Sequence, residues 1–177
     1  MEKVEQEMRT RSVLVPVLGA VALMLVLRVL LLDVVRVEGH SMEPTLHPGE
    51  VLLVSRWSYG LQSPFFNDYL FLWHRPQPGD IVVFQNPLDG VLVVKRCVAL
   101  EGEPIQVEND IMHIGNTTVR LTSSEAKRFA GYVSVPPGTI FVLGDNRAIS
   151  EDSRVYGFIP ISRLVGRVVF RFPGSGP

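Results

Sequence analysis

The hydrophobic pattern divides the chain into one long apolar run and a longer region of short runs. Residues 13–32 are apolar except for Arg28. At the rise of an α-helix, about 20 residues span roughly 30 Å, the thickness of the hydrocarbon layer of a bilayer. The pattern therefore predicts a transmembrane helix over residues 13–32, preceded by a short charged segment over residues 1–12.

A membrane-length run near an N-terminus is a cleavable signal peptide or an uncleaved signal-anchor, and a buried helix of a soluble protein is a third alternative. Residues 30–38 contain no pair of small residues at the spacing of a cleavage site. We therefore expect a signal-anchor. The basic residues before the run favour a cytoplasmic N-terminus, although Arg28 and Arg36 weaken this bias.

Beyond Asp33, short β-branched runs bounded by Gly, Pro, Asn and Asp replace helical spacing, a pattern typical of an all-β domain. We expect this β-rich domain to cover residues 33–172, followed by a frayed tail over residues 173–177. Gly115-Asn116 predicts a tight hairpin, and Ser123–Ala130 predicts one or two helical turns. The predicted strands are Glu50–Ser55, Asp80–Phe84, Val91–Leu100, Ile105–Glu108, Ile111–Ile114, Thr117–Leu121, Thr139–Leu143 and Leu164–Phe172.

The stretch Trp57–Pro78 differs from the rest because it concentrates aromatic residues in a loop-like sequence. Its rings either fill the domain core or lie in the headgroup layer beside the anchor, where amphipathic rings settle. The sequence leaves both alternatives open.

Composition narrows the functional classes. The net charge of −1 provides no overall field that would recruit nucleic acid. The single cysteine, Cys97, excludes an internal disulfide and a multi-cysteine metal site. His47, His74 and His113 lack the spacing of metal ligands, so we expect neither a metal nor another cofactor.

The residues directly after the apolar run carry the first candidate chemistry. Ser41 lies between Gly39 and Pro44, so this stretch can turn sharply and expose a hydroxyl. A lone serine is more often a solvated or capping residue. Whether Ser41 is catalytic therefore depends on the other candidate residues along the chain.

Lys95 is the second candidate, because it interrupts the apolar run Leu92–Leu100. It is either an edge-strand lysine that faces water or a buried amine whose pKa is lowered towards neutrality. A neutral amine can take a proton from a serine, as in a Ser–Lys dyad. Arg96 is expected on the opposite face of the strand.

The polar stretch Gly144–Gly157 is the third candidate. Its density of Gly, Asp, Asn and Ser is also compatible with a simple turn. Ser150 can exchange a hydrogen bond with a neutral amine and hold it towards Ser41. Asp152 and Arg154 can lock the loop through charge-assisted hydrogen bonds.

Four stretches follow one another along the chain: Ser41–Leu46, Gly79–Phe84, Val94–Arg96 and Gly144–Arg154. In sequence, order and spacing they resemble the successive boxes of bacterial type I signal peptidases. The similarity runs from the apolar run to Phe172. It implies an all-β peptidase domain, a sheet or barrel outside the membrane, that removes signal peptides from exported preproteins at the outer face of the bacterial cytoplasmic membrane.

The resemblance assigns a role to each matched residue. It makes Ser41 the nucleophile and Lys95 the general base of a serine endopeptidase that acts through an acyl-enzyme. Ser150 matches the serine that orients the lysine. The other matched positions are supporting residues, and the last two of them form an expected salt bridge between boxes: Asp152, Arg154, Asp145 and Arg96.

The sequence departs from the family pattern at three places. Gly39 stands where some members carry a serine that donates to the oxyanion, so the second donor must come from elsewhere. His40 adjoins Ser41, but strand neighbours point to opposite faces, so we expect it to be non-catalytic. Ala148-Ile149 replaces a common Asp-Asn pair, which affects the hydrogen bonds of that loop.

Substrate binding is implied by the resemblance to the family's cleft. Shallow apolar pockets would admit small side chains one and three residues before the cut, with the preprotein bound as an added strand. Any one of the aliphatic residues that line these pockets could equally well be an ordinary residue of the hydrophobic core. The matched residues are Val35, Val37, Met42, Leu46, Val93 and Val94. The implied partners are preprotein signal peptides, the lipid bilayer and the protein-export machinery.

Two alternatives remain beside this interpretation. A self-cleaving Ser–Lys protease like the SOS-response repressors shares part of the fold but carries a DNA-binding domain where this chain has residues 13–32. A catalytically impaired relative would act as a membrane-bound preprotein-binding or scaffolding module, an alternative that Gly39 and Ile149 keep open.

Overall fold

The computed structural model describes residues 14–21, 24, 31–63 and 68–174. Residues 14–21 are helical, and none of the helices in these described ranges is long and apolar enough to cross a membrane. Residues 13, 22–23 and 25–30 of the expected transmembrane segment lie outside the described residues, as do residues 1–12 and 175–177. The segment therefore stays a prediction.

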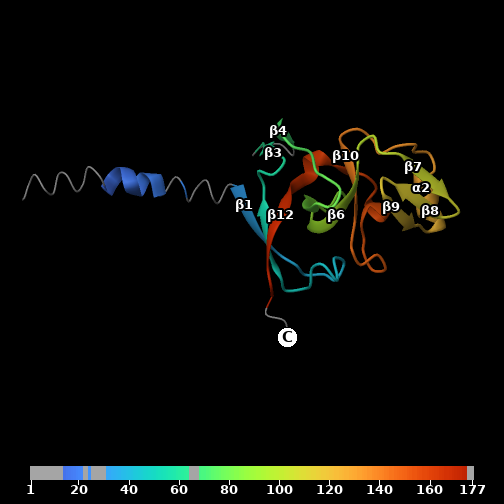
Figure 1. Ribbon diagram of the computed structural model, residues 1–177, viewed down its shortest axis with the longest axis horizontal. Helices are drawn as coiled ribbons and strands as arrows, with labels where there is room; N and C mark the ends of the chain where they lie inside the picture. The colour runs from blue at the N-terminus through green and yellow to red at the C-terminus, as the bar shows by residue number, and fades with distance from the viewer. Residues whose placement is uncertain (1–13, 22–23, 25–30, 64–67, 175–177) are drawn as a thin grey trace, which may run out of the picture.

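The centre of the fold is a seven-stranded antiparallel sheet with the order β1-β2-β12-β5-β6-β10-β11 (Figure 1). Its strands are β1 Leu32–Arg36, β2 Val51–Ser55, β12 Leu164–Phe172, β5 Ile81–Gln85, β6 Leu92–Leu100, β10 Thr139–Leu143 and β11 Ile159–Pro160. Three strands separate β1 from β6 in this order, yet both strands line one cavity. The sheet therefore curls so that β1 faces β6.

The middle of the sheet is covered on both faces, which explains why the sequence of β5 is a continuous apolar run. Val82, Val83 and Phe84 of β5 are all fully buried. Val82 and Phe84 pack in one core cluster with Tyr59 and Ile159, whereas Val83 packs in another with Met42. A strand buried on both faces reads as a run of aliphatics rather than as an alternation.

Two smaller sheets complete the domain. β3 Gly60–Gln62 pairs with β4 Tyr69–Leu72, and β7 Ile105–Glu108, β8 Ile111–Ile114 and β9 Thr117–Arg120 form a meander. Helix α2 Ser123–Phe129 follows the meander and starts at a capping box formed by Thr122 and Glu125. Figure 1 shows the meander and α2 at the end of the molecule remote from β1.

The predicted all-β fold is confirmed, and all eight predicted strands are present within a residue or two of their expected bounds. The structure adds β1, which begins at the last residue of the expected membrane segment, and β11. It also adds the short helices α3 Ser153–Tyr156 and η1 Ile161–Arg163. The predicted Gly115-Asn116 hairpin turn is present, and Gly115 adopts the positive φ of 52° that this turn requires.

The aromatic residues of the stretch 57–78 do not all share one environment: one of them fills the core, whereas others lie on the surface. Tyr59 is buried in the core and its hydroxyl donates to Asp80 at 3.0 Å. Trp57, Phe71 and Trp73 are exposed. This stretch was expected to be loop-like, whereas β3 and β4 form a hairpin within it.

Candidate active site

Ser41 lies in a tight turn that follows β1. The backbone N–H of Glu43 donates to the carbonyl of His40, and that of Leu46 donates to the carbonyl of Met42. Met42 and Leu46 are each 2% exposed and anchor the turn in the core, whereas Gly39 and His40 are exposed. The chain therefore holds Ser41 at the boundary between core and solvent.

Lys95 reaches the same point from the middle of β6. It lies opposite Val82 of β5, and β10 pairs with β6 only from Arg96 onward. On one side of Lys95, β6 pairs with β5. On the other side, the pairing with β10 ends one residue away, at Arg96. The side chain is 4% exposed, so the edge-strand alternative that places Lys95 in water is wrong.

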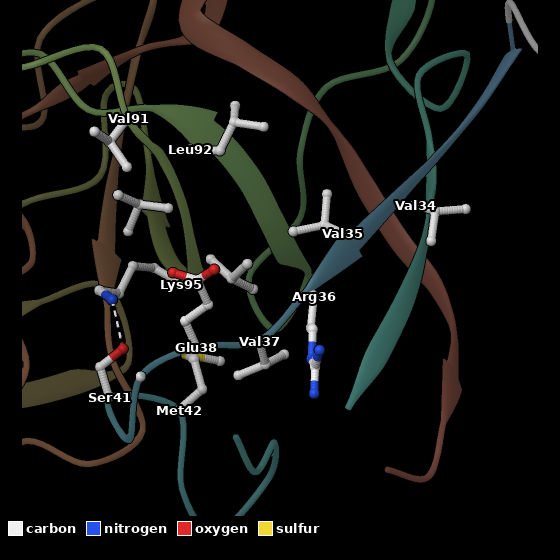
Figure 2. A pocket seen from close by; sticks show the side chains of 13 residues that line it. Val34, Val35, Arg36, Val37, Glu38, Ser41, Met42, Val91, Leu92 and Lys95 are labelled. Atoms are coloured by element: carbon white, nitrogen blue, oxygen red, sulfur yellow. Dashed lines mark hydrogen bonds between the residues drawn. The ribbon is translucent and has the colours of Figure 1, made fainter. Parts of the chain in front are cut away.

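The two side chains form the central contact of the site. Lys95 Nζ and Ser41 Oγ are hydrogen-bonded at 2.7 Å (Figure 2). Burial lowers the pKa of Lys95 below its ordinary value, and the charges of Asp152 and Glu151 oppose this shift only in part. Within the described residues, no carboxylate forms an ion pair with Lys95. The site therefore favours a neutral amine beside the serine hydroxyl.

A buried ion pair fixes the loop behind this contact. Asp152 is fully buried and binds Arg154 through both carboxylate oxygens, at 2.9 and 3.0 Å. The same carboxylate accepts the backbone N–H of Gly144 at 3.0 Å, and Arg154 donates to the carbonyls of Arg147 and Ser150. The expected locking of the loop by Asp152 and Arg154 is present in the structure.

Ser150 is placed differently from the expectation. Its hydroxyl is buried and has no hydrogen-bond partner in the described part of the chain, so the expected bond to Lys95 is not formed. The hydroxyl instead packs against Gly144, where an added Cβ would lie 2.1 Å from Ser150 Oγ and 2.5 Å from the Ser41 carbonyl oxygen. Gly144 is needed because three segments meet there without room for a side chain.

Arg96 and Asp145 form the expected salt bridge on the other face of β6. Arg96 donates to the two Asp145 oxygens at 2.8 and 2.7 Å, and also to the carbonyl of Gly79 at 2.9 Å. Burial tends to raise the pKa of Asp145, but hydrogen bonds from Arg96 and Thr45 and the Arg96 charge lower it below its usual value. This bridge ties β6 to the loop that follows β10.

A cavity of about 460 Å³ leads to the Ser41–Lys95 contact, between β1 and β6. Figure 2 shows aliphatic side chains from both strands around it. Five of the six expected binding residues line it, together with six residues that were not among the expected binding residues. The expected ones are Val35, Val37, Met42, Val93 and Val94, and the added ones are Val34, Arg36, Glu38, Gly39, Val91 and Leu92. Leu46 is buried in the core cluster behind the cavity and is not among its lining residues.

The remaining candidates play no part in this contact. His40 is exposed and its Nδ1 lies 2.9 Å from Glu43 Oε1. It belongs to a turn, so the strand geometry that we expected there is wrong. Cys97 is fully buried, and burial raises the pKa of its thiol to about 12. The described residues include no group of His, Cys, Asp and Glu side chains that could hold a metal ion.

A serine hydroxyl hydrogen-bonded to a buried lysine on a β scaffold defines a candidate serine hydrolase of the Ser–Lys type. The sequence model of the family described as signal peptidase, peptidase S26, matches residues 10–173. The chain belongs to this family.

Two signal peptidases I from Bacillus species agree with this assignment. Signal peptidase I of Bacillus caldolyticus is 34% identical over 169 residues, which cover 86% of each chain. Signal peptidase I of Bacillus amyloliquefaciens is 37% identical over 166 residues, covering 86% of this chain and 80% of the relative. A crystal structure of a signal peptidase I from Enterococcus faecalis V583 is 29% identical and covers 54% of this chain and 97% of its own, with a TM-score of 0.41.

Proposed function

We propose that this chain is a signal peptidase I, a serine endopeptidase that removes N-terminal signal peptides from exported preproteins. The observation that carries the proposal is the 2.7 Å contact between Ser41 Oγ and the buried amine of Lys95. Family membership and relatives named signal peptidase I support the same activity.

Catalysis begins with the neutral amine of Lys95. Its lone pair takes the proton of the Ser41 hydroxyl while Oγ attacks the scissile carbonyl carbon. The oxyanion that forms accepts a hydrogen bond from the backbone N–H of Ser41. Lys95 then gives its proton to the departing amine, which leaves an acyl-enzyme on Ser41. In the second half, Lys95 takes a proton from water, the hydroxide attacks the ester, and Ser41 regains its proton as the signal peptide is released.

The cavity between β1 and β6 is the binding site for the residues before the cut. Leu92–Lys95 of β6 extend beyond the end of β10, so one edge of this segment is open to pairing. A preprotein in extended conformation adds a strand there through main-chain hydrogen bonds. The valine side chains and Met42 that line the cavity leave shallow apolar space, which suits small side chains and excludes large ones.

Membrane attachment is part of the proposal. The apolar run over residues 13–32 anchors the chain, with the peptidase domain on the outer face of the bacterial cytoplasmic membrane, where preproteins emerge. The alternative of an impaired preprotein-binding module has less support, because the serine and the lysine that such a module would not need lie in hydrogen-bonding contact.

Cleavage of a radiolabelled preprotein by the full chain in detergent tests this function. We expect the wild type to cut after a small-x-small site, and the Ser41→Ala and Lys95→Ala variants to be inactive. His40→Ala is the matched control, because its side chain is exposed beside Ser41 and should leave cleavage intact. Cleavage by Lys95→Ala would assign the base elsewhere, and no cleavage by folded wild-type protein would favour the binding module.

A further inference from the structure

A second cavity, of about 440 Å³, follows the first along strand β6. The first cavity is lined by Leu92–Lys95 of this strand, and the second by Arg96, Cys97 and Val98. Its other walls are the loop before β5, the residues that precede β7, the β8–β9 turn and Arg147. Along β6, Lys95 is the last residue that lines the first cavity and Arg96 is the first that lines the second.

Arg147 links the second cavity to the nucleophile. Its neighbour Asn146 donates a backbone hydrogen bond to the Ser41 carbonyl at 3.0 Å. Asp145 and Asp152 are the carboxylates that act on Arg147, but Arg96 and Arg154 already hold them in ion pairs. In the described part of the chain, the Arg147 guanidinium has no ion-pair partner of its own. It is an exposed cation one residue along the chain from the Asn146 contact with Ser41.

The course of a bound preprotein leads towards this cation, given the function proposed above. The residues before the cut pair with the open edge of Leu92–Lys95. An added strand cannot continue past Lys95, because Leu143 of β10 already pairs with Arg96. The residues after the cut must therefore leave the sheet at the loop that contains Arg147.

We propose that the second cavity receives the mature segment of the preprotein directly after the cut, and that Arg147 pairs with an acidic side chain in it. The cavity carries charges of both signs. Glu103 also lines it, packed against the Gly115 turn beside Val98, in a segment of the wall other than the Arg147 loop. Acidic residues are therefore favoured close to the cut, and this preference disappears further along the mature segment.

Binding and cleavage of matched substrates by the full chain in detergent test this assignment. Fluorescent preprotein peptides carry Asp, Asn or Lys in turn at each of the first six positions after the cut. Binding is measured to the Ser41→Ala variant, which leaves the peptide uncut, and cleavage is measured with intact Ser41. We expect Asp to be preferred over Lys by about threefold to tenfold at one or more of the first positions, the size of a partly exposed ion pair replaced by repulsion.

Substitutions of Arg147 assign the preference to this side chain. Arg147→Gln should remove the difference between Asp and Lys, and Arg147→Glu should reverse it. Arg120→Glu on β9 changes the net charge equally at an exposed position outside the cavity and should preserve the difference. Urea midpoints of the variants show whether each remains folded, which is expected because the Arg147 side chain is exposed.

The outcomes separate this inference from the proposed function. Equal Asp-to-Lys ratios in the wild type and Arg147→Glu overturn the inference, even when cleavage is efficient. A charge preference that follows Arg147 in the binding assay, without cleavage by the wild type, supports the inference as a binding site and overturns the peptidase function alone.

Discussion

Replacing Asp152 by alanine should destabilise the domain by about 3 to 5 kcal/mol, the cost of breaking a buried ion pair by removing one partner. The Asp152 carboxylate is fully buried and the Arg154 side chain is only 14% exposed. The substitution leaves that guanidinium without its counter-charge. It also removes the side-chain acceptor of the Arg154 N–H at the start of α3 and of the Gly144 N–H.

The assay is urea unfolding of the full chain in detergent, followed by circular dichroism and extrapolated to zero denaturant. Asp89→Ala is the control, because that carboxylate is exposed and, among the residues that the structure describes, accepts only the backbone N–H of Val91. It should cost less than about 1 kcal/mol. The double variant Asp152→Ala/Arg154→Ala should lose less than the sum of the single losses, since removing both partners leaves no unpaired charge.

The same substitution has a second consequence, for catalysis. The Asp152 charge raises the pKa of Lys95 against the larger effect of burial. Without it the lysine deprotonates at lower pH, so the acid limb of kcat/KM should move to lower pH in whatever fraction remains folded. A loss of stability no larger than that of Asp89→Ala would refute the reasoning about the buried pair.

Three further predictions follow from the buried groups. Lys95→Met should stabilise the protein at neutral pH, because folding of the wild type must remove a proton from the amine that it buries. This gain in stability should shrink as the pH of the urea assay rises towards 10.5. It should vanish above that pH, since the lysine of the unfolded chain is then neutral as well. Native Cys97 should react with N-ethylmaleimide at pH 8 at least about 100-fold more slowly than in urea, because its thiol is buried and its pKa is raised to about 12; equal rates would contradict its burial. Arg96→Ala should cost about 1.5 to 3 kcal/mol in the urea assay by releasing Asp145, and a loss equal to that of Arg120→Ala would contradict this.

Local sequence chemistry was sufficient to locate most strands of the domain. The β8–β9 hairpin follows from a glycine that can adopt positive φ, and α2 from a capping box, both of which act over a few residues. β1 was missed because its residues continue an apolar run that suits a membrane helix equally well. β3 and β4 were missed because their exposed Leu70 and Phe71 break the alternation that marks a half-buried strand.

The site shows the same division between local and non-local information. The burial of Lys95 could be suspected from its apolar neighbours, but its contact with Ser41 depends on the curl of a whole sheet. The Ser150 hydroxyl, which has no hydrogen-bond partner among the described residues, and the second cavity beside Arg147 both arise where several segments meet. Such meeting points leave no pattern in a single stretch of sequence.

The central claim is that neutral Lys95 removes the proton from Ser41, and the most direct measurement is the pH dependence of cleavage. kcat/KM is measured from about pH 5 to about pH 11 for the wild type, Lys95→Arg and Ser41→Ala. The account predicts that wild-type activity rises through an apparent pKa below the ordinary lysine value of 10.5. Lys95→Arg should be inactive at every pH, because a guanidinium stays protonated in proteins. Activity in Lys95→Arg, or a wild-type profile that rises only near pH 10.5, would contradict the claim.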